Sequence, residues 1–258
     1  MEGTIEHKVM KPTISIITVT FNAANVLPGL IESLRAQSDQ DFEWIVVDGA
    51  SMDGTVNIIQ SASDVVSKWV SEPDFGIYHA MNKAIDRATG EYYLVMGADD
   101  RLECDAIERY RYFAQQSNAD IITAYITRKG KIYKGKPKYT WLYAMNALIV
   151  NHSVGALIRR SLHEEFGLYS KRFPIGADMY FIKLACQSSS TKIFRADFIA
   201  GNYSEVGISS TDKAAAFCDY FRVQLETEKF KLLQVIMFSA KLLWRAKDLV
   251  KETDKKTS

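Results

Sequence analysis

Apolar and polar positions alternate between two patterns along the first hundred residues. Four short, largely apolar runs are typical of buried strands, and they are residues 13–20, 42–47, 68–70 and 92–96. The segments between them repeat apolar residues at helical spacing, and they are residues 25–37, 55–62 and 77–88. Strands that alternate with helices indicate βαβ units. We therefore expect an α/β fold, with a mainly parallel sheet flanked by helices.

The alternation stops after residue 106. Residues 121–127 and 131–133 predict a hairpin around Lys129 and Gly130. Further on, residues 217–250 form one long helical pattern in which Phe, Leu and Trp are interleaved with Lys and Arg. A basic amphipathic helix of this kind lies in a membrane interface, or its apolar stripe packs on the rest of the chain or on another subunit. Both interpretations stay open at this stage.

Composition narrows the function classes. The net charge of the 258-residue chain is +1, which gives no reason to expect nucleic acid as a partner. Three scattered cysteines predict neither a disulfide framework nor a cysteine metal site. The first eleven residues lack the apolar core of a signal peptide, and no run of 18 apolar residues occurs. We expect a protein of a reducing, cytoplasmic compartment.

Two adjacent carboxylates follow the run at 92–96. Asp99 and Asp100 stand where an open α/β sheet binds ligands, at the carboxyl end of a strand. Their hard oxygen atoms suit Mg²⁺ or Mn²⁺, ions that commonly accompany phosphates. The alternative is that Asp100 caps a helix that begins near Glu103, with Asp99 solvated.

Two other predicted strands also end in polar loops. Residues 20–22 follow the first strand, and residues 48–55 follow the second. Asp48 stands directly at a strand end, where its carboxylate can accept hydrogen bonds from a ligand. Asp53 is better explained as a helix N-cap. The chain has no G-x-G-x-x-G and no Walker A sequence, which removes the main support for a dinucleotide or P-loop site.

Four motifs in order carry a resemblance to a known family. They are residues 14–22, 43–55, 71–85 and 88–100, and together they resemble the family 2 glycosyltransferases. The resemblance covers about residues 12–210, and it is strongest to bacterial enzymes that build surface polysaccharides such as O-antigen or colanic acid. It implies a GT-A fold, with a Rossmann-like sheet and a C-terminal helical extension. It also implies inverting transfer from a nucleotide-diphospho-sugar, expected to be a UDP-sugar, to a hydroxyl of a glycan or lipid-linked acceptor.

The resemblance implies a domain division and a donor site. We expect an N-terminal extension at 1–11, a catalytic domain at 12–215 with halves at 12–100 and 101–215, and a basic helical tail at 216–258. The implied donor contacts are Thr20, Asn22, Asp48, Asn82, Lys83 and Asp99. Asp48 would bind the base, and Asp100 would bind Mn²⁺ or Mg²⁺, with Asp99 as a further ligand. Lys83 also fits a solvated helix face. Gly97 stands where many relatives have Asn.

Displacement at a sugar carbon also needs a general base on the acceptor hydroxyl. Asp178, at the start of a helix predicted over 179–186, is the candidate, and its alternative is an N-cap. In relatives a similar block carries the catalytic base, and here Ala177 replaces its first acid. The resemblance also assigns His152, Arg172 and Ser209 to the acceptor and diphosphate region. A structural role is the simpler explanation for His152, and a surface role equally explains Arg172.

Two other function classes compete with this reading. A nucleotidyltransferase has a similar architecture, but it usually carries a Gly-rich basic loop after the first strand, which residues 20–24 lack. A sugar-nucleotide-binding scaffold would have no need of Asp178. For a glycosyltransferase, we expect as partners a nucleotide-sugar and a glycan or lipid-linked acceptor. We also expect contact with the inner face of the cytoplasmic membrane through the tail, and with a second copy of the chain.

Overall fold

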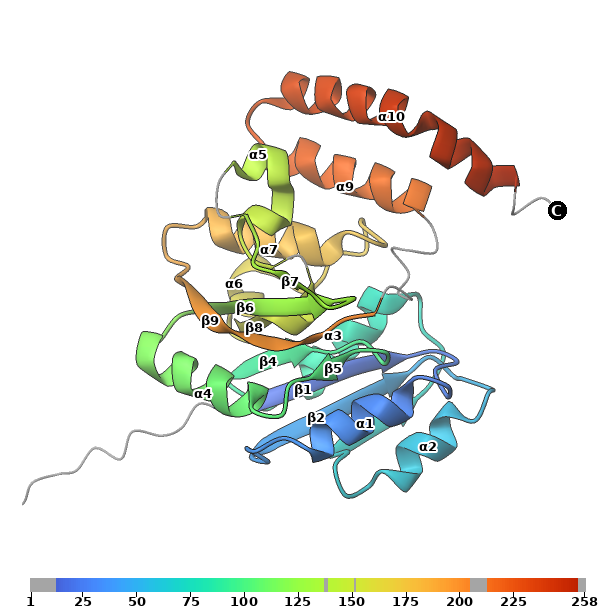
Figure 1. Cartoon of the computed structure of the whole chain (residues 1–258), viewed down its shortest axis with the longest axis vertical. Helices are drawn as coiled ribbons and strands as arrows, with labels where there is room; N and C mark the ends of the chain where they lie inside the picture. The colour runs from blue at the N-terminus through green and yellow to red at the C-terminus, as the bar shows by residue number, and fades with distance from the viewer. Residues whose placement is uncertain (1–12, 137–138, 151, 205–212, 255–258) are drawn as a thin grey trace, which may run out of the picture.

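The computed structural model describes residues 13–136, 139–150, 152–204 and 213–254, except for the side chains of residues 213 and 245–254. Its first half follows the predicted alternation of strands and helices (Figure 1). The elements are β1 (Ile14–Thr20), α1 (Leu27–Arg35), β2 (Phe42–Asp48), α2 (Thr55–Ser61), β3 (Lys68–Ser71), α3 (Ile77–Arg87) and β4 (Tyr92–Val95). These boundaries confirm the hydrophobic pattern to within two residues at each end.

The second half contains shorter elements. They are β5 (Arg101–Leu102), α4 (Ala106–Ser117), β6 (Ile121–Arg128), β7 (Lys131–Tyr133), α5 (Thr140–Tyr143), two 3₁₀ turns (Ala144–Ala147 and Ser153–Gly155), β8 (Ala156–Arg159), α6 (Leu162–Phe166), α7 (Ala177–Gln187), β9 (Ile193–Asn202), α9 (Lys213–Thr227) and α10 (Lys231–Asp254). The predicted hairpin is confirmed as the antiparallel pair β6 and β7. Lys129 and Gly130 both have positive φ, as its tight turn requires.

All the described strands join one sheet, in the order β3-β2-β1-β4-β8-β6-β9-β5, with β7 beside β6. The strands β3, β2, β1 and β4 are parallel, so their carboxyl ends meet at one edge. Strand β8 then enters antiparallel to β4, and the second half of the sheet is mixed. The expectation of a parallel sheet therefore holds for the half that carries the four motifs.

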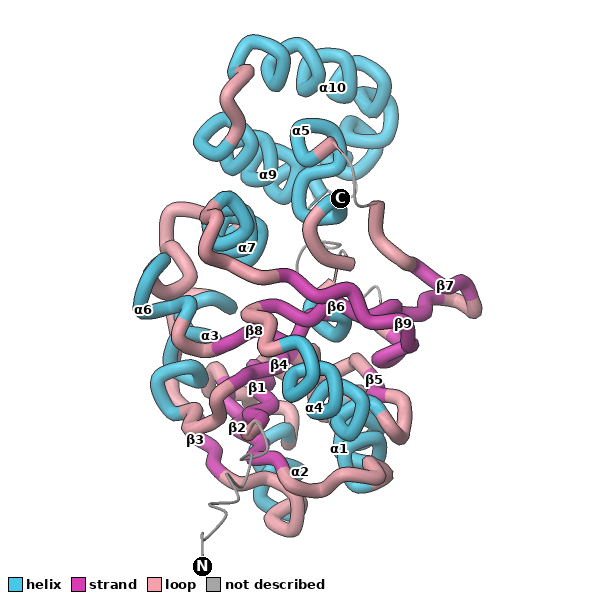
Figure 2. The backbone as a smooth tube through the Cα atoms, turned by 90° about the vertical axis from the view of Figure 1, so that its left-hand side faces the viewer, coloured by secondary structure: helices cyan, strands magenta, loops and turns pink. Residues whose placement is uncertain are grey.

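Successive residues of the strands supply two cores, one on each face of the sheet. Tyr92 points into a cluster with side chains of α1, α2 and α4, and the adjacent Tyr93 points into a cluster with α3, α6 and α7. Both tyrosine side chains are fully buried. The helices thus cover both faces of the sheet, as Figure 2 shows from the side.

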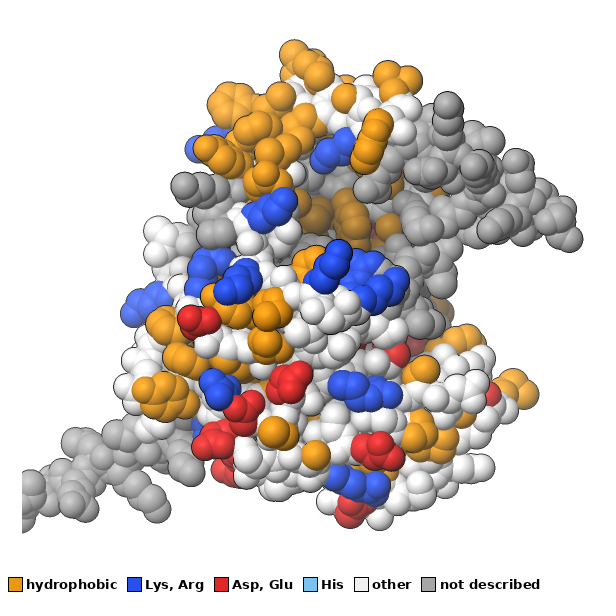
Figure 3. Space-filling model, in the orientation of Figure 1, with side chains coloured by type: hydrophobic (Ala, Val, Ile, Leu, Met, Phe, Trp, Pro, Cys, Tyr) orange, Lys and Arg blue, Asp and Glu red, His pale blue; other side chains and the backbone are white. Residues whose placement is uncertain are grey.

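The C-terminal region differs from the single long helix that its pattern predicted. Helix α9 ends at Thr227, and α10 begins at Lys231 and turns back over α9. Phe238 of α10 stacks on Phe217 and Phe221 of α9, with ring centroids 4.7 and 4.0 Å apart. Burial of these rings against one another stabilises the turn over a straight helix. Hydrophobic side chains gather on this helical part of the molecule in Figure 3.

Helix α9 is attached to the sheet-containing part through α7. Lys183 of α7 is fully buried, and its ammonium group pairs with Glu228 and donates to Gln224. Asp219 Oδ2 accepts the N–H groups of Ile175 and Gly176, both at 2.9 Å, directly before α7 begins. The tail predicted from residue 216 therefore packs on the rest of the chain through α9, which was one of the two interpretations left open. None of the described helices has the length and apolar character needed to cross a bilayer.

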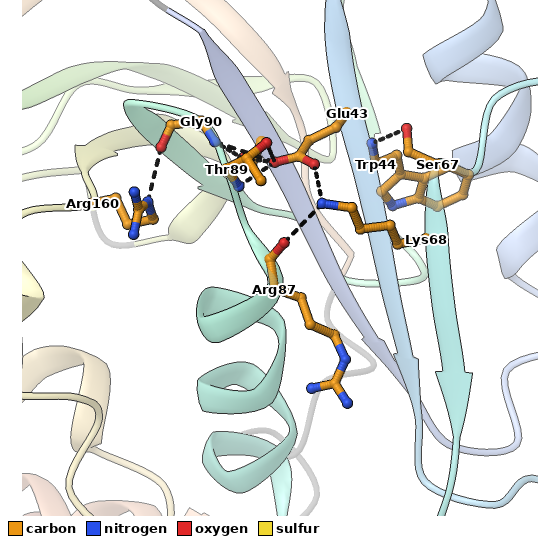
Figure 4. Close-up of polar contacts among 9 residues, drawn as sticks. Glu43, Trp44, Ser67, Lys68, Arg87, Thr89, Gly90 and Arg160 are labelled. Carbon is orange, nitrogen blue, oxygen red and sulfur yellow. Dashed lines mark hydrogen bonds and ion pairs between the residues drawn. The ribbon is translucent and has the colours of Figure 1, made fainter.

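A polar cluster at the opposite edge of the sheet links the amino ends of the parallel strands (Figure 4). The Glu43 carboxylate accepts hydrogen bonds from Ser15 Oγ at 2.6 Å and from the Thr89 N–H at 2.5 Å, and it pairs with Lys68 Nζ at 2.9 Å. Burial opposes the charge, but these bonds outweigh it and lower the pKa of Glu43 to about 2. Arg160 donates to the Gly90 carbonyl at this same edge. Arg160 therefore lies at the edge remote from the strand ends that carry Asp48 and Asp99.

Candidate active site

A cavity of about 1880 Å³ opens where the carboxyl ends of β1 and β4 face the C-terminal helices. Five residues predicted from the sequence line it, and they are Thr20, Asp99, Asp100, His152 and Asp178. Pockets for a single small ligand are usually about 300–1,000 Å³. This cavity therefore has room for two substrates side by side.

Asp99 and Asp100 lie in a tight turn after β4. Asp100 is 1% exposed, and its Oδ2 accepts the Gly97 N–H at 2.8 Å. Burial, and after it the charge of Asp99, raise the pKa of Asp100 to about 8. Strand β5 follows immediately at Arg101, and α4 begins only at Ala106. The alternative that Asp100 caps a helix beginning near Glu103 is therefore wrong.

The same turn explains the glycine at position 97. A Cβ atom there would lie 2.9 Å from Asp100 Oδ2 and 3.0 Å from Asp99 Oδ1. Both distances are shorter than ordinary contacts of a Cβ atom. The absence of a side chain at Gly97 is what lets both carboxylates fold back over the turn in this arrangement.

This carboxylate pair fits a divalent cation. Asp99 Oδ2 is buried and has no hydrogen-bond partner among the described residues, although buried polar atoms are almost always paired. A cation bound by Asp99 and Asp100 would satisfy that oxygen and relieve the repulsion that raises the pKa of Asp100. Within the described ranges, no group of three or more His, Cys, Asp or Glu side chains could hold a metal. The remaining ligands would have to come from a bound phosphate group or from water.

His152 lies beside the carboxylates as a neutral side chain. Its Nε2 is 3.9 Å from Asp100 Oδ1, and its ring stacks on Tyr203 with centroids 4.3 Å apart. Burial lowers the pKa of His152 to about 4, although the charge of Asp99 opposes this. At neutral pH the imidazole therefore contributes shape and hydrogen bonding to the site but no positive charge.

Asp178 faces the cavity from the first turn of α7. Helix α7 begins at Ala177 after the N-cap residue Gly176, so Asp178 is not the N-cap. Its Oδ1 accepts the Tyr78 hydroxyl at 2.7 Å. Burial raises the pKa of Asp178, and the hydrogen bond from Tyr78 works in the opposite direction. A carboxylate with a raised pKa at the edge of a cavity is suited to accept a proton from a substrate.

Asp48 is fully buried beneath the loop that follows β2 and does not line the cavity. Its two oxygens accept four hydrogen bonds, from Thr20 Oγ1 at 2.8 Å, the Ser51 N–H at 2.9 Å, Ser51 Oγ at 2.5 Å and Ser71 Oγ at 2.7 Å. Burial opposes the charge, but these four bonds lower the pKa of Asp48. The carboxylate has no lone pair left over, so it holds the loops that end β1, β2 and β3 together.

Three other predicted donor contacts lie outside the cavity lining. The Asn22 side chain accepts the Met52 N–H at 3.0 Å, which joins the loops after β1 and β2. The Asn82 amide makes two hydrogen bonds with the backbone of Tyr169. Lys83 pairs with Glu72 at 2.7 Å and donates to the Pro73 carbonyl at 3.3 Å. Its side chain is only 18% exposed, so it is neither a cavity-lining residue nor part of a solvated helix face.

The three residues predicted on the acceptor side also differ in whether they line the cavity. Arg172 is largely exposed, pairs with Glu226 of α9 and does not line the cavity. Ser209 lies outside the described residues. Only His152 of these three predictions lies in the described cavity lining.

Sequence reasoning missed several residues of the cavity. Phe21, which is 69% exposed, and Asp74 line the end near Thr20, and Tyr78 lines the floor beside Asp178. All three stand inside the motifs at 14–22 and 71–85, so their place in these motifs was the available signal. The apolar residues of α9 and α10 in the lining gave no such signal, because a helical stripe is equally typical of core packing.

In sequence, the chain is similar to known glycosyltransferases. The family model described as "Glycosyl transferase family 2" matches residues 15–199. A PGL/p-HBAD biosynthesis glycosyltransferase of Mycobacterium bovis is 30% identical over 207 residues, covering 76% of this chain and 78% of that protein. A putative teichuronic acid biosynthesis glycosyltransferase, TuaG of Bacillus subtilis, is 32% identical over 119 residues, covering 45% and 47% of the two chains.

Solved structures resemble the chain in fold. TarS residues 1–349 of S. aureus, crystallised with UDP, has a TM-score of 0.66 at 19% identity over 90% of this chain and 71% of that one. The mannosyltransferase PcManGT of Pyrobaculum calidifontis, in complex with GDP-Man and Mn²⁺, has a TM-score of 0.62 at 18% identity over 92% and 76% of the two chains. The fold is the predicted GT-A fold, with a helical C-terminal region. The family match covers more than half of the chain and includes the strand-end motifs, and the chain therefore belongs to glycosyl transferase family 2.

Proposed function

We propose that this glycosyltransferase moves a sugar from a UDP-sugar to a hydroxyl of a glycan or lipid-linked acceptor, with inversion, in the biosynthesis of a bacterial surface polysaccharide. The observation that carries the proposal is that Asp99 and Asp100 from the end of β4 and Asp178 from α7 line one cavity. Solved neighbours hold UDP, UDP-GlcNAc and GDP-Man, which supports a nucleotide-sugar donor. The printed names of the relatives support a role in cell-surface glycan assembly.

The donor end of the cavity is the end lined by Thr20, Asp99 and Asp100. The ring of Phe21, exposed at this end, offers a face on which a nucleobase can stack. Asp99 and Asp100 would hold Mn²⁺ or Mg²⁺ beside the diphosphate, and the bound ion would supply Lewis-acid stabilisation of the leaving group. Asp48, through its bond to Thr20, and Asn22, through its bond to Met52, support this end from outside the lining. Direct contact between Asp48 and the base would require Asp48 to release one of its four hydrogen bonds.

Asp178 is the proposed general base. As the acceptor hydroxyl oxygen forms its bond to C1 of the donor sugar, the Asp178 carboxylate takes the hydroxyl proton. The bond between C1 and the diphosphate oxygen breaks, and the nucleoside diphosphate leaves with the electron pair. Attack from the face opposite the leaving group inverts the configuration at C1. The raised pKa of Asp178 makes the carboxylate a better proton acceptor than an exposed one.

We also propose that α10 contacts a membrane surface from one side. Five apolar side chains of α10 are exposed and do not line the cavity, and they are Leu232, Val235, Ile236, Leu242 and Leu243. Lys231 stands at the start of these residues, and a basic side chain beside exposed apolar ones is typical of helices that lie in a lipid interface. Flotation with anionic vesicles checks this contact. If these side chains instead join two copies of the chain, the protein dimerises without binding vesicles.

The donor proposal is tested by thermal unfolding of the chain with UDP-, GDP- and dTDP-sugars in the presence of Mn²⁺. Because a ligand that binds only the native state raises its stability, we expect UDP-sugars to raise the unfolding temperature. The same sugars should release UDP when an acceptor is added. No stabilisation and no UDP release with any nucleotide-sugar would overturn the proposal.

A further inference from the structure

The cavity has a second wall that the proposed chemistry does not use. Opposite the carboxylates, α5, α9 and α10 enclose it with apolar side chains, and these include Leu142, Tyr143, Phe217, Phe221, Met237 and Phe238. In Figure 3 the surface is hollowed below the C-terminal helices, and hydrophobic side chains lie inside the hollow. These six side chains are only partly buried, so the wall keeps apolar surface exposed towards the cavity. Exposed apolar surface of this kind usually marks a binding site.

The two glutamine side chains of this wall are already engaged. Gln224 Nε2 and Gln234 Nε2 both donate to the Trp141 carbonyl, at 3.3 and 3.1 Å, and Gln224 Oε1 accepts from Lys183. A second glycan would need free donors and acceptors here, because sugar hydroxyls are held by hydrogen bonds. Lys241 is the one charged side chain of α10 among the described lining residues, and its methylene groups can themselves cover apolar surface. The wall therefore matches hydrocarbon better than carbohydrate.

The wall begins next to the proposed base. A Cβ atom on Gly176 would lie 3.2 Å from Tyr220 Cδ1 of α9, and Asp219 holds the Gly176 N–H. Gly176 precedes Asp178 by two residues. A group lying against α9 is thus close to the hydroxyl that Asp178 would deprotonate.

We propose that this wall binds the apolar aglycone of the acceptor, a hydrocarbon chain attached to the sugar that receives the new unit. The inference rests on the proposed function, and it specifies the acceptor as a lipid-linked sugar rather than a free glycan. The hydrocarbon lies inside the cavity against the inward face of α10. It is separate from any membrane contact of the outward face, which carries Ile236.

Two neighbouring residues of α10 allow a matched test. Met237 lines the cavity, whereas Ile236 is 58% exposed and does not line it. Binding of methyl and octyl β-glucoside, below the micelle concentration of the octyl compound, is measured by calorimetry on the full chain. Because each buried methylene group adds several-fold to affinity, we expect octyl glucoside to bind at least about tenfold more tightly than methyl glucoside. Met237→Gln should abolish most of that preference, and Ile236→Gln should keep it.

A second variant guards against a folding defect. Leu142→Gln changes the wall from α5 and should give the same loss as Met237→Gln, with circular dichroism and thermal unfolding as checks on both. Equal binding of the two glucosides by the parent chain would overturn the inference. The inference would also be overturned if Ile236→Gln lost as much of the preference for octyl glucoside as Met237→Gln does, because the detergent would then be binding to the outward face of α10.

Release of UDP from UDP-sugars, measured separately, distinguishes this failure from failure of the proposed function. If UDP is released but methyl and octyl glucosides serve equally well as acceptors, the hydrocarbon site is refuted and the proposed function stands. If the octyl preference depends on Met237 but no nucleotide-sugar is turned over, the hydrocarbon site stands and the proposed function does not.

Discussion

The Tyr78 hydroxyl oxygen lies 2.7 Å from Asp178 Oδ1 and 2.8 Å from the Ile175 carbonyl oxygen. A tyrosine hydroxyl has one hydrogen, so it donates to only one of these two oxygens at a time. When Asp178 is ionised, Tyr78 donates to it. When Asp178 has taken a proton, the carboxyl group can donate to the Tyr78 oxygen while Tyr78 donates to Ile175. The arrangement thus keeps a hydrogen bond to the proposed base both before and after proton transfer.

Tyr78→Phe tests this relationship through the pH dependence of kcat/KM. The hydrogen bond from Tyr78 stabilises the ionised carboxylate and thereby lowers the pKa of Asp178. Because the substitution removes this bond, the pKa of Asp178 should rise. A hydrogen bond to a charged group contributes about 1.5–3 kcal/mol, and we expect the acid limb to move up by about one pH unit or more. Tyr169→Phe is the matched control, because the buried Tyr169 hydroxyl bonds to Tyr93 at 3.0 Å. A shift of the same size in both variants would contradict the assignment.

Asp178→Asn tests the base itself. The amide keeps the shape of the side chain but cannot take the acceptor proton, so turnover should fall by about 10²–10⁴-fold. The affinity for UDP in the presence of Mn²⁺ should stay within about twofold, since Asp99 and Asp100 are unchanged. The measurements are UDP release and calorimetric binding of UDP. Turnover near the parent rate would remove Asp178 from this role.

Asp100→Asn tests the cation site through stability. The folded pKa of Asp100 is about 8, far above that of an unfolded aspartate, so its contribution to stability is full below about pH 4. That contribution is lost as the pH rises from about 4 through 8, so the unfolding temperature of the metal-free protein should fall over this pH range. Mn²⁺ should restore it, with a larger effect at pH 8 than at pH 6. In Asp100→Asn both the pH trend and the Mn²⁺ effect should shrink, and an unchanged Mn²⁺ effect would place the ion elsewhere.

Glu43→Gln tests the polar cluster at the opposite edge of the sheet. The folded pKa of Glu43 is about 2, below its unfolded value, so its contribution to stability is present above about pH 4.5 and is lost as the pH falls towards 2. At pH 7 the substitution should lower the free energy of unfolding by about 1–3 kcal/mol, because several bonds to the carboxylate weaken together. The measurement is urea unfolding at pH 7 and pH 3, and the difference between variants should be smaller at pH 3.

Asp64→Asn is the control for this comparison. It breaks the exposed ion pair with Arg35, which has an N–O distance of 2.6 Å. Because exposed pairs contribute about 0–1 kcal/mol, the change in unfolding free energy should be smaller than for Glu43→Gln. If the two substitutions had equal effects, Glu43 would be an ordinary surface charge.

The first half of the fold could be predicted from the sequence because its signals are local. The apolar runs at 13–20, 42–47 and 92–96 became β1, β2 and β4, and the turn at Lys129 and Gly130 became the hairpin. Parallel pairing then brings strand ends to one edge, so Thr20, Asp99 and Asp100 could be expected at a common site. The motifs at the strand ends also identified the family, since their order along the chain is itself a sequence property.

Other relationships depend on residues far apart in the chain, and only the tertiary structure decided them. Asp48 looks like a free strand-end ligand, but Ser71, 23 residues away, helps to occupy its oxygens. Tyr78 and Asp178, 100 residues apart, meet only because α3 and α7 pack on the same face of the sheet. The long apolar pattern near the C-terminus contained no signal for the break after Thr227, because the gain comes from Phe238 stacking on α9. Local pattern thus determined the elements and the family, whereas packing decided which polar atoms are still free to bind a substrate.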